Sequence, residues 1–542
     1  MENGGKHTEK KPLIGKWLAV GIILLFITTC IIPAIAQDTG KTRLISRGKW
    51  LYVGGSGPGN YTRIQDAIDN ASMGDTIYVY DDSAPYLERL TINSTLTLLG
   101  ENQTTTIINS TAEDYYTIIA INADDVFLSG FFIVLNGGPG VEVFANHTKL
   151  SNLNMHSGLN NGWSGTGVTL HITHDAEITD ILITNAQIGI LLTDSIHATI
   201  TRNRIINPGL NGITVYSSDN TIDNNTIIGN MDQYTQPVGI HISGSHNHLA
   251  HNTITAVLGN ALKGISLFGV TGSVIEGNNL QNTGFEQGNS EANQFVNNIV
   301  NGKPLVFLVD KSDTIVDNAG QVILVNCTRM TVQDIILSCV PYGVQLIGTT
   351  DSVIQDCHIS SCLYGASLEE SQDNLIQNNT LLNCEWGFNI YQGGSNRLEN
   401  NTISRSNYSG LLISSRDTQI SYNLVSNCSV GITITDCLRN IATRNVIQHC
   451  VYGVYLESAV MVTITQNTFL DNRLFSGLQQ NTLLNRWSGN YWNRPRVIPK
   501  IVPGKIVIIW HPDPIHYKGI IIPFINIDWH PAKVPFDTPF VS

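Results

Sequence analysis

The stretch GASLEESQDNLIQNNTLLNCEW, residues 365–386, decides the fold, because similar units repeat on both sides of it. Six such units align between residues 343 and 472 with a period of 21 to 23 residues. Earlier copies begin at Gly189, Gly212, Gly239 and Gly264. Each unit opens on Gly, and its apolar residues then alternate with polar ones, which is the periodicity of β-strands and not of helices.

A single unit is too short to bury its apolar face, whereas stacked units bury it against their neighbours. The repeat therefore predicts an all-β fold, a right-handed single-stranded parallel β-helix with coils about 4.8 Å apart. Helical spacing over Tyr61–Ala71, followed by a strand at Thr76–Tyr80, predicts a short N-terminal capping helix. Such a cap covers the open apolar end of the solenoid.

The pattern also divides the chain into segments. Residues 50–100 form the N-terminal cap and first coils, and residues 101–480 form the parallel β-helix. Residues 281–340 interrupt the rhythm, as either an extra-long coil or a loop excursion. Residues 481–542, rich in Pro, Trp and Ile, are expected to form an irregular C-terminal cap or a tail that docks on the last coil.

The composition agrees with stacked coils. Charged residues make up only 13% of the 542 residues, against about 25% in a typical soluble domain. Asparagine occurs 54 times, and the net charge is −13. Equal positions on successive coils lie one strand spacing apart, where like charges repel and amides can pair. The acidic balance argues against nucleic acid as a partner.

One column of the alignment is expected to be a structural Asn ladder, in which each amide bonds to its copy on the next coil. The column is occupied by Cys357 once and otherwise by asparagines. These are Asn203, Asn225, Asn252, Asn278, Asn379, Asn401, Asn423, Asn445 and Asn467.

The N-terminus predicts export. A basic flank precedes an uncharged apolar stretch at residues 17–37, and Ala34-Ile35-Ala36 fits a signal-peptide cleavage site. The same stretch is long enough to remain as a membrane tether. Residues 1–37 are therefore either a signal peptide or an N-terminal membrane anchor. The chain is expected to be secreted or displayed at the cell surface, where its twelve Asn-x-Ser/Thr sequons permit glycosylation.

The cysteines leave two interpretations open. Eight of the nine lie between Cys327 and Cys450, and one column repeats Cys three residues before the Gly. Stacked thiols are ordinary core filling, which is the favoured interpretation. An even number in an exported chain also permits disulfides, with Cys362–Cys384 and Cys428–Cys450 as the candidate pairs.

Two other groups are candidates for binding. His241, His246, His248 and His251 crowd one coil and form a candidate metal site, although an exposed polar turn is the plainer interpretation. An aromatic column precedes the Gly at Tyr342, Tyr364, Trp386 and Tyr452. It could contact carbohydrate, but its parity with Val344 and Leu346 favours packing in the core.

The segment GNYTRIQDAIDNASMGDTIYVYDDSAPYLERLTI resembles the first coil of pectin-lyase-like β-helix proteins. The Gly-led, Asn-centred repeats are similar to NosD-type β-helices with the CASH domain, and the tail resembles that of archaeal surface proteins of this type. The resemblance implies either carbohydrate binding or polysaccharide lyase or glycoside hydrolase activity. A NosD-like member would instead mature a copper site.

We therefore expect an exported, non-catalytic β-helix protein that binds an extracellular polysaccharide or glycoprotein. A lyase or hydrolase is the first alternative, and a copper-site maturation factor is the second. No catalytic residue can be assigned from the sequence. No cofactor is required by this interpretation, although Ca²⁺ or Cu²⁺ would fit the two alternatives.

Overall fold

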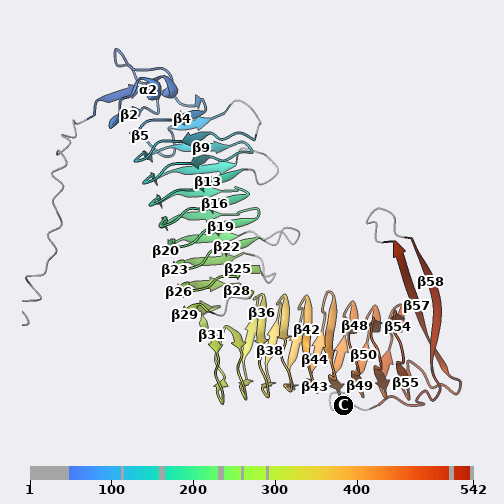
Figure 1. Cartoon of the computed structure of the whole chain (residues 1–542). Helices are drawn as coiled ribbons and strands as arrows, with labels where there is room; N and C mark the ends of the chain where they lie inside the picture. Colours follow the sequence, from blue (N-terminus) through green and yellow to red (C-terminus); the bar gives the residue numbers. More distant parts are fainter. Residues whose placement is uncertain are drawn as a thin grey trace, which may run out of the picture. The chain divides into compact units, whose positions relative to one another are not determined.

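The computed structural model describes residues 48–110, 115–157, 165–229, 237–257, 262–288, 292–511 and 518–536 (Figure 1). It confirms the all-β fold and the right-handed parallel β-helix, because strands pair in parallel with the strands one coil before and one coil after them. The apolar stretch at residues 17–37 lies outside the described residues. Among those described, no helix is long and apolar enough to cross a membrane.

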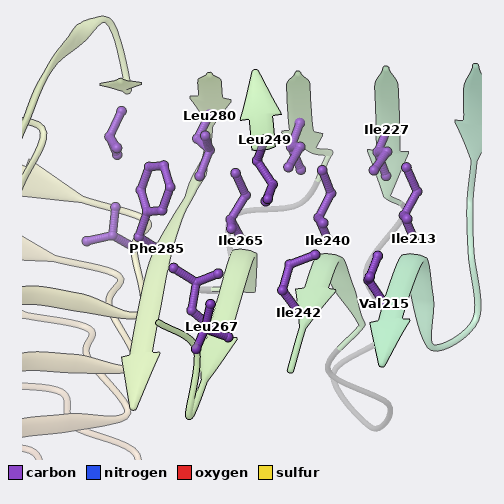
Figure 2. Packing of buried hydrophobic residues seen from close by; sticks show 14 of the residues in the cluster. Ile213, Val215, Ile227, Ile240, Ile242, Leu249, Ile265, Leu267, Leu280 and Phe285 are labelled. Carbon is purple, nitrogen blue, oxygen red and sulfur yellow. The ribbon is translucent and has the colours of Figure 1, made fainter. Parts of the chain in front are cut away.

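The coils form two successive stacks, and the first has three sheets called A, B and C here. Sheet A has 11 strands, from β1 (Trp50–Val53) to β29 (Gln294–Val296). Sheet C has nine, from β4 (Leu90–Ile92) to β28 (Thr283–Gly288). Sheet B lies between them along each coil. Inward side chains at equal positions pile up into a continuous apolar core, as Ile213, Ile240 and Ile265 show in Figure 2.

The second stack has sheets E, F and G. Sheet F runs through nine strands from β32 (Ile315–Val316) to β55 (Arg486–Ser488), and sheet G through eight from β35 (Ile336–Ser338) to β56 (Tyr491–Trp492). The coils therefore continue to Trp492, beyond the predicted limit of residue 480. The sequence alignment did not include the last units, because Ser476 occupies the position at which the other units have Gly. Gly477 follows it directly.

Sheet E carries the longest strands of the second stack. It includes β33 (Gln321–Val325), β36 (Tyr342–Ile347), β39 (Tyr364–Glu369), β42 (Trp386–Gly394) and β45 (Ser409–Arg416). The later members are β48 (Val430–Thr435), β51 (Tyr452–Glu457) and β54 (Phe475–Gln480). These strands pair in parallel and in register, one per coil.

The predicted interruption at residues 281–340 is the junction between the stacks. The coils continue to β30 (Ile299–Val300), which pairs antiparallel with β31 (Lys303–Val309), and the second stack begins there. The Gln321 side chain closes the exposed edge of sheet C. Its Oε1 accepts a hydrogen bond from the Phe285 backbone N–H at 2.8 Å, and its Nε2 donates to the Phe285 carbonyl at 2.7 Å.

The predicted Asn column forms a hydrogen-bonded ladder. Asn225 is typical, because its Oδ1 accepts from both the backbone N–H and the Nδ2 of Asn203, each at 3.0 Å. Its Nδ2 donates to the Ile200 carbonyl at 2.8 Å and to Asn252 Oδ1 at 3.0 Å. These amides are buried, so each bond satisfies a group that has no access to water.

A second inner ladder, which the sequence did not suggest, lies at the turn before sheets A and F. Asn374 Nδ2 donates to Asn396 Oδ1 at 3.1 Å and to the Thr349 carbonyl at 2.9 Å. Ser and Thr occupy some positions of this column in place of Asn, as at Ser352 and Thr418. Because the residue type varies, the column does not stand out in the sequence. The remaining asparagines of the ladder are Asn220, Asn247, Asn293, Asn440 and Asn485.

Each end of the solenoid is closed by a cap. Helix α2 (Ile64–Asn70) lies inside the predicted Tyr61–Ala71 segment, and β2 (Asp75–Val79) follows it. At the other end, β57 (Lys500–His511) extends sheet E and pairs antiparallel with β58 (Lys518–Asp528). Asp528 is fully buried and accepts hydrogen bonds from the Asn490 and Trp492 side chains.

The eight described cysteines are free thiols. Seven are buried, and Cys339 is half-buried. The four cysteines of the candidate disulfides, Cys362–Cys384 and Cys428–Cys450, are buried among the core residues as free thiols. Burial raises the pKa of Cys357 to about 11 and that of Cys437 to about 11.

Replacing one ladder residue tests what the ladder contributes to stability. In Asn401→Ala, the backbone N–H of Asn379, its Nδ2 and the Ile376 carbonyl lose their buried partners. We expect a local loss of roughly 3–5 kcal/mol. Hydrogen exchange of the amides in the neighbouring coils will measure it. The matched control is Asn378→Gly, because Asn378 is exposed and has a φ of 56°, a conformation that Gly adopts without cost.

Thiol labelling tests the state of the cysteines. A buried thiol with a raised pKa is protonated at neutral pH and reacts slowly with iodoacetamide. We therefore expect Cys339 to react first in the native protein, and the seven buried cysteines to react only after unfolding. Mass spectrometry without prior reduction will count the labels. Fewer labels after unfolding than after unfolding with reduction would show that disulfides are present.

Candidate functional site

Four aromatic side chains stack across successive coils where the sheet-E strands begin. The ring centroids are 5.1 Å apart for Tyr342 and Tyr364, 6.3 Å for Tyr364 and Trp386, and 4.8 Å for Trp386 and Tyr408. The ring planes agree within 17°. We call these four residues the aromatic strip. Three belong to the predicted column, and the sequence alignment missed Tyr408.

The parity of the aromatic column predicted that its rings would pack in the core. In the structure, the rings of the aromatic strip lie outside the core. In the pairing of β36 with β39, Tyr342 is opposite Tyr364 and Val344 is opposite Ala366. Gly343, between them, has no partner in this register. A Cβ on Gly343 would lie 2.7 Å from Ile359 of the core and 2.5 Å from the Gly365 carbonyl. Gly343 therefore faces inward beside Val344 and shifts the alternation, which turns Tyr342 outward.

The strip ends where the next coil carries an aliphatic residue. Val430 pairs with Ser409, the residue after Tyr408, and Tyr408 is 54% exposed. Tyr452, the fourth predicted residue, pairs with Val430 and stacks with Phe475 at 6.4 Å. Among the described residues, Tyr408 therefore has an aromatic neighbour, Trp386, on only one face.

A row of polar side chains follows the strip along the same strands. Glu369 Oε1 accepts hydrogen bonds from Gln345 Nε2 at 3.1 Å and from the Ser367 hydroxyl at 3.2 Å. Asn389 Nδ2 donates to the Ser367 oxygen at 3.1 Å. We call these four residues the polar row. Gln345 is 1% exposed, and its Oε1 has no hydrogen-bond partner among the described residues.

The first stack contributes an ion pair beside the strip. Glu286 on β28 accepts from Lys263 Nζ at 2.9 Å and from the Ser266 hydroxyl at 2.9 Å, and its side chain is 8% exposed. Burial raises the pKa of Tyr342, and the negative charge of Glu286 raises it further. The same two effects, together with the charge of Glu369, raise the pKa of Tyr364. The carboxylate therefore lies near both phenols, which stay protonated as donors.

A cavity of about 430 Å³ opens where the same strands end. Its polar lining comes from Asn326, Glu369, Glu370, Tyr391 and Gln392. The volume is within the range of small-ligand sites in proteins. The aromatic strip, the polar row and this cavity follow one another from the start to the end of the sheet-E strands. We call this surface the sheet-E face.

The sheet-E face presents apolar ring edges beside hydrogen-bond acceptors and amide donors. This combination suits a ligand with apolar C–H surfaces and many hydroxyl groups. The sequence held a signal for the polar row. The third residue of the repeat is Gln345, Ser367 and Asn389 in three successive units, and Leu412 in the next. The position is polar again at Thr433 in the unit that follows.

The four candidate metal-ligating histidines do not meet at one site. His248 pairs with Glu276 at 2.9 Å and His251 with Asp223 at 3.0 Å. His241 lies on sheet C between Tyr216 and Phe268, where burial lowers its pKa. His246 lies in a turn beneath Gly272. In the part of the chain that the structure describes, no group of three or more His, Cys, Asp or Glu is arranged to hold a metal ion.

Comparison with known families matches both stacks. Residues 307–497 match the family described as periplasmic copper-binding protein (NosD). Residues 94–255 match the family described as right handed beta helix region. No curated protein matches the sequence.

Solved structures with some similarity include the catalytic domain of a GH87 α-1,3-glucanase in complex with nigerose, at 13% identity and a TM-score of 0.29 over 82% of this chain and 69% of that chain. An alginate lyase from Paenibacillus sp. has 15% identity and a TM-score of 0.24, over 61% and 95%. The tailspike of E. coli bacteriophage HK620, in complex with a pentasaccharide, has 10% identity and a TM-score of 0.32, over 83% and 80%. Scores this low carry no functional inference.

The family matches and the observed solenoid agree with each other and with the repeat that the sequence displays. The chain folds as a right-handed parallel β-helix, and its second stack is similar to the NosD family.

Proposed function

We propose that this chain is an exported, non-catalytic β-helix protein that binds an extracellular polysaccharide on the sheet-E face. The observation that carries the proposal is the aromatic strip beside the polar row and the cavity, with Tyr342, Tyr364 and Trp386 half-buried and Tyr408 54% exposed. The periplasmic family match and the apolar N-terminal stretch support export.

The strip offers two kinds of contact to a sugar. Along most of its length the rings cover one another's faces, so a polysaccharide meets ring edges and the phenol groups of Tyr342 and Tyr364. At Tyr408 one ring face has no aromatic neighbour, and a pyranose can stack there with its C–H groups against the ring. Val430, in the next coil, gives the floor of this position an apolar character.

The polar row supplies the hydrogen bonds that distinguish one sugar from another. Glu369 and Asn389 are half-buried and offer a carboxylate and an amide to the ligand, while the buried Gln345 and Ser367 side chains hold them in place. Sugar hydroxyls donate and accept, so they can satisfy these groups together. The acidic side chains favour a neutral or amino-substituted polymer over a polyuronate, because like charges would repel.

Replacing rings of the strip tests the proposal. We expect Tyr408→Ala and Trp386→Ala each to weaken glycan binding about tenfold, because each removes an aromatic contact. A glycan array will find the ligand, and calorimetry will measure the affinities. The matched control is Tyr216→Ala on the first stack, since Tyr216 is 51% exposed and lies outside the sheet-E face. No binding by wild type, or equal loss in the control, would contradict the proposal.

Hydrolysis or lysis of a polysaccharide is the second candidate, favoured by two adjacent carboxylates, Glu369 and Glu370, in the cavity. A pair of carboxyl groups about 5–10 Å apart is the usual apparatus of glycosidases. If the site is catalytic, Glu369→Gln and Glu370→Gln should each reduce turnover at least about 100-fold while binding persists. A panel of neutral, amino and uronate polymers will test activity. Turnover in wild type that survives both substitutions would place catalysis elsewhere.

A further inference from the structure

The C-terminal hairpin of β57 and β58 exposes an unusual amount of apolar surface. One of its faces carries Ile501, which is 54% exposed, Ile521 at 63% and Ile525 at 59%. The register places Ile501 opposite Ile527, Pro503 opposite Ile525 and Val507 opposite Ile521. We call the face formed by Ile501, Pro503, Val507, Ile521, Pro523 and Ile525, with the exposed Lys505 opposite Pro523, the hairpin face. Contiguous exposed apolar surface of this kind marks an interaction site.

The hairpin face belongs to a basic segment of an acidic protein. Residues 494–536 carry six Lys or Arg against two Asp, in a chain whose net charge is −13. One of the two acids, Asp528, is buried and bound to backbone and side-chain N–H groups. The surface of the hairpin is therefore more cationic than the count suggests.

These cations have no carboxylate partners within the described residues. Arg494, Arg496, Lys500, Lys505 and Lys533 form none of the ion pairs found there. Arg496 Nε is buried without a hydrogen-bond partner among those residues. Burial and the charges of Arg496 and Arg494 lower the pKa of Lys500, whose Nζ lies 5.7 Å from the centroid of the Trp492 ring, on the face of β57 opposite Ile501. The cluster is suited to an anionic surface.

Prolines in both strands argue against another β-strand as the occupant. A strand that added to the hairpin would pair with a row of backbone N–H and C=O groups along a free edge. Pro503 in β57 and Pro523 in β58 have no N–H and interrupt those rows. The hairpin thus displays its faces while its edges are protected against pairing with a second copy of the chain.

We propose that the hairpin face, with its own Lys505 and the preceding cations Arg494 and Arg496, binds the surface of an anionic phospholipid membrane. The isoleucines enter the boundary between headgroups and acyl chains, and the cations contact lipid phosphates. Insertion is shallow, because a two-stranded hairpin leaves edge N–H and C=O groups that the hydrocarbon core would not satisfy. This contact is separate from the sheet-E face and does not depend on what that face binds.

The test uses the full chain, with a readout confined to the hairpin because the apolar stretch at residues 17–37 can itself bind lipid. Hydrogen exchange is measured with vesicles of phosphatidylcholine containing phosphatidylglycerol, with pure phosphatidylcholine vesicles and without vesicles. We expect slower exchange in residues 500–511 and 518–528 with the anionic vesicles alone. High salt should remove this protection, since it screens the charges.

Variants separate the two contributions. The triple variant Arg494→Gln, Arg496→Gln, Lys505→Gln should weaken the hairpin's vesicle binding on the order of 100-fold, at about fivefold per charge. Ile521→Ser with Ile525→Ser should weaken it about tenfold. The matched controls are Arg204→Gln and Ile336→Ser, which change an exposed arginine and a 68% exposed isoleucine on the solenoid. These controls should leave the protection unchanged.

Three outcomes would overturn the proposal. Protection that rises with protein concentration in the absence of vesicles would identify a second copy of the chain as the occupant. Equal protection with neutral and anionic vesicles would remove the role of the cations. Vesicle binding with no protection of the hairpin would assign the lipid contact to another part of the chain.

Discussion

The structure depends on one constraint, which is that every position of a coil lies beside its own copy one strand spacing away. A side chain is tolerated at a given position only if it can pack against, or bond to, the side chain at the same position of the next coil. Apolar residues do so inside the solenoid, and asparagine does so at its corners, because its amide both donates and accepts. Charged residues are few, and at exposed turns some pair with an opposite charge on the next coil, as Arg329 does with Asp313. Asp125, His147, Asp175 and His197 occupy one column of turns, with His–Asp distances of 3.4, 3.6 and 3.7 Å.

The turns impose a second demand that also favours asparagine. The described residues include 49 non-glycine positions with positive φ, of which 14 are Asn and 14 are Asp. These two residues tolerate the left-handed conformation better than most others. Several sequons coincide with such turns, among them Asn326, Asn378 and Asn427. The high Asn content therefore has two structural causes, the inner ladders and the outer turns, and the number of sequons follows from the second.

The repeat made the fold and one ladder predictable, because both are properties of columns. Features that occur once were not predictable in this way. The junction depends on Gln321, which replaces a missing strand by bonding both backbone groups of Phe285, and no neighbouring coil shows the same residue in that role. The orientation of the aromatic strip depends on Gly343, whose inward position reverses the parity of Tyr342. Only part of the candidate site could be predicted. The aromatic column appears in the alignment of repeats, but Glu286 belongs to the other stack and so lies outside that alignment.

Because stacked coils satisfy each other's polar groups, the places where the stacking ends need a different solution, and both ends use a buried carboxylate. At the first coils Glu88 accepts hydrogen bonds from the backbone N–H groups of Ile64 and Gln65, at 2.8 and 3.1 Å, and so holds α2 in place. At the last coil Asp528 takes the place of the next ladder residue. It accepts from the Asn490 backbone N–H at 2.9 Å, where an Asn Oδ1 would otherwise serve. A carboxylate fits here because it only accepts hydrogen bonds. An Asn at this terminal position would also carry N–H donors, for which no further coil supplies an acceptor. The tail that supplies Asp528 is thereby fixed to the solenoid, and this attachment presents the apolar hairpin beyond the last coil.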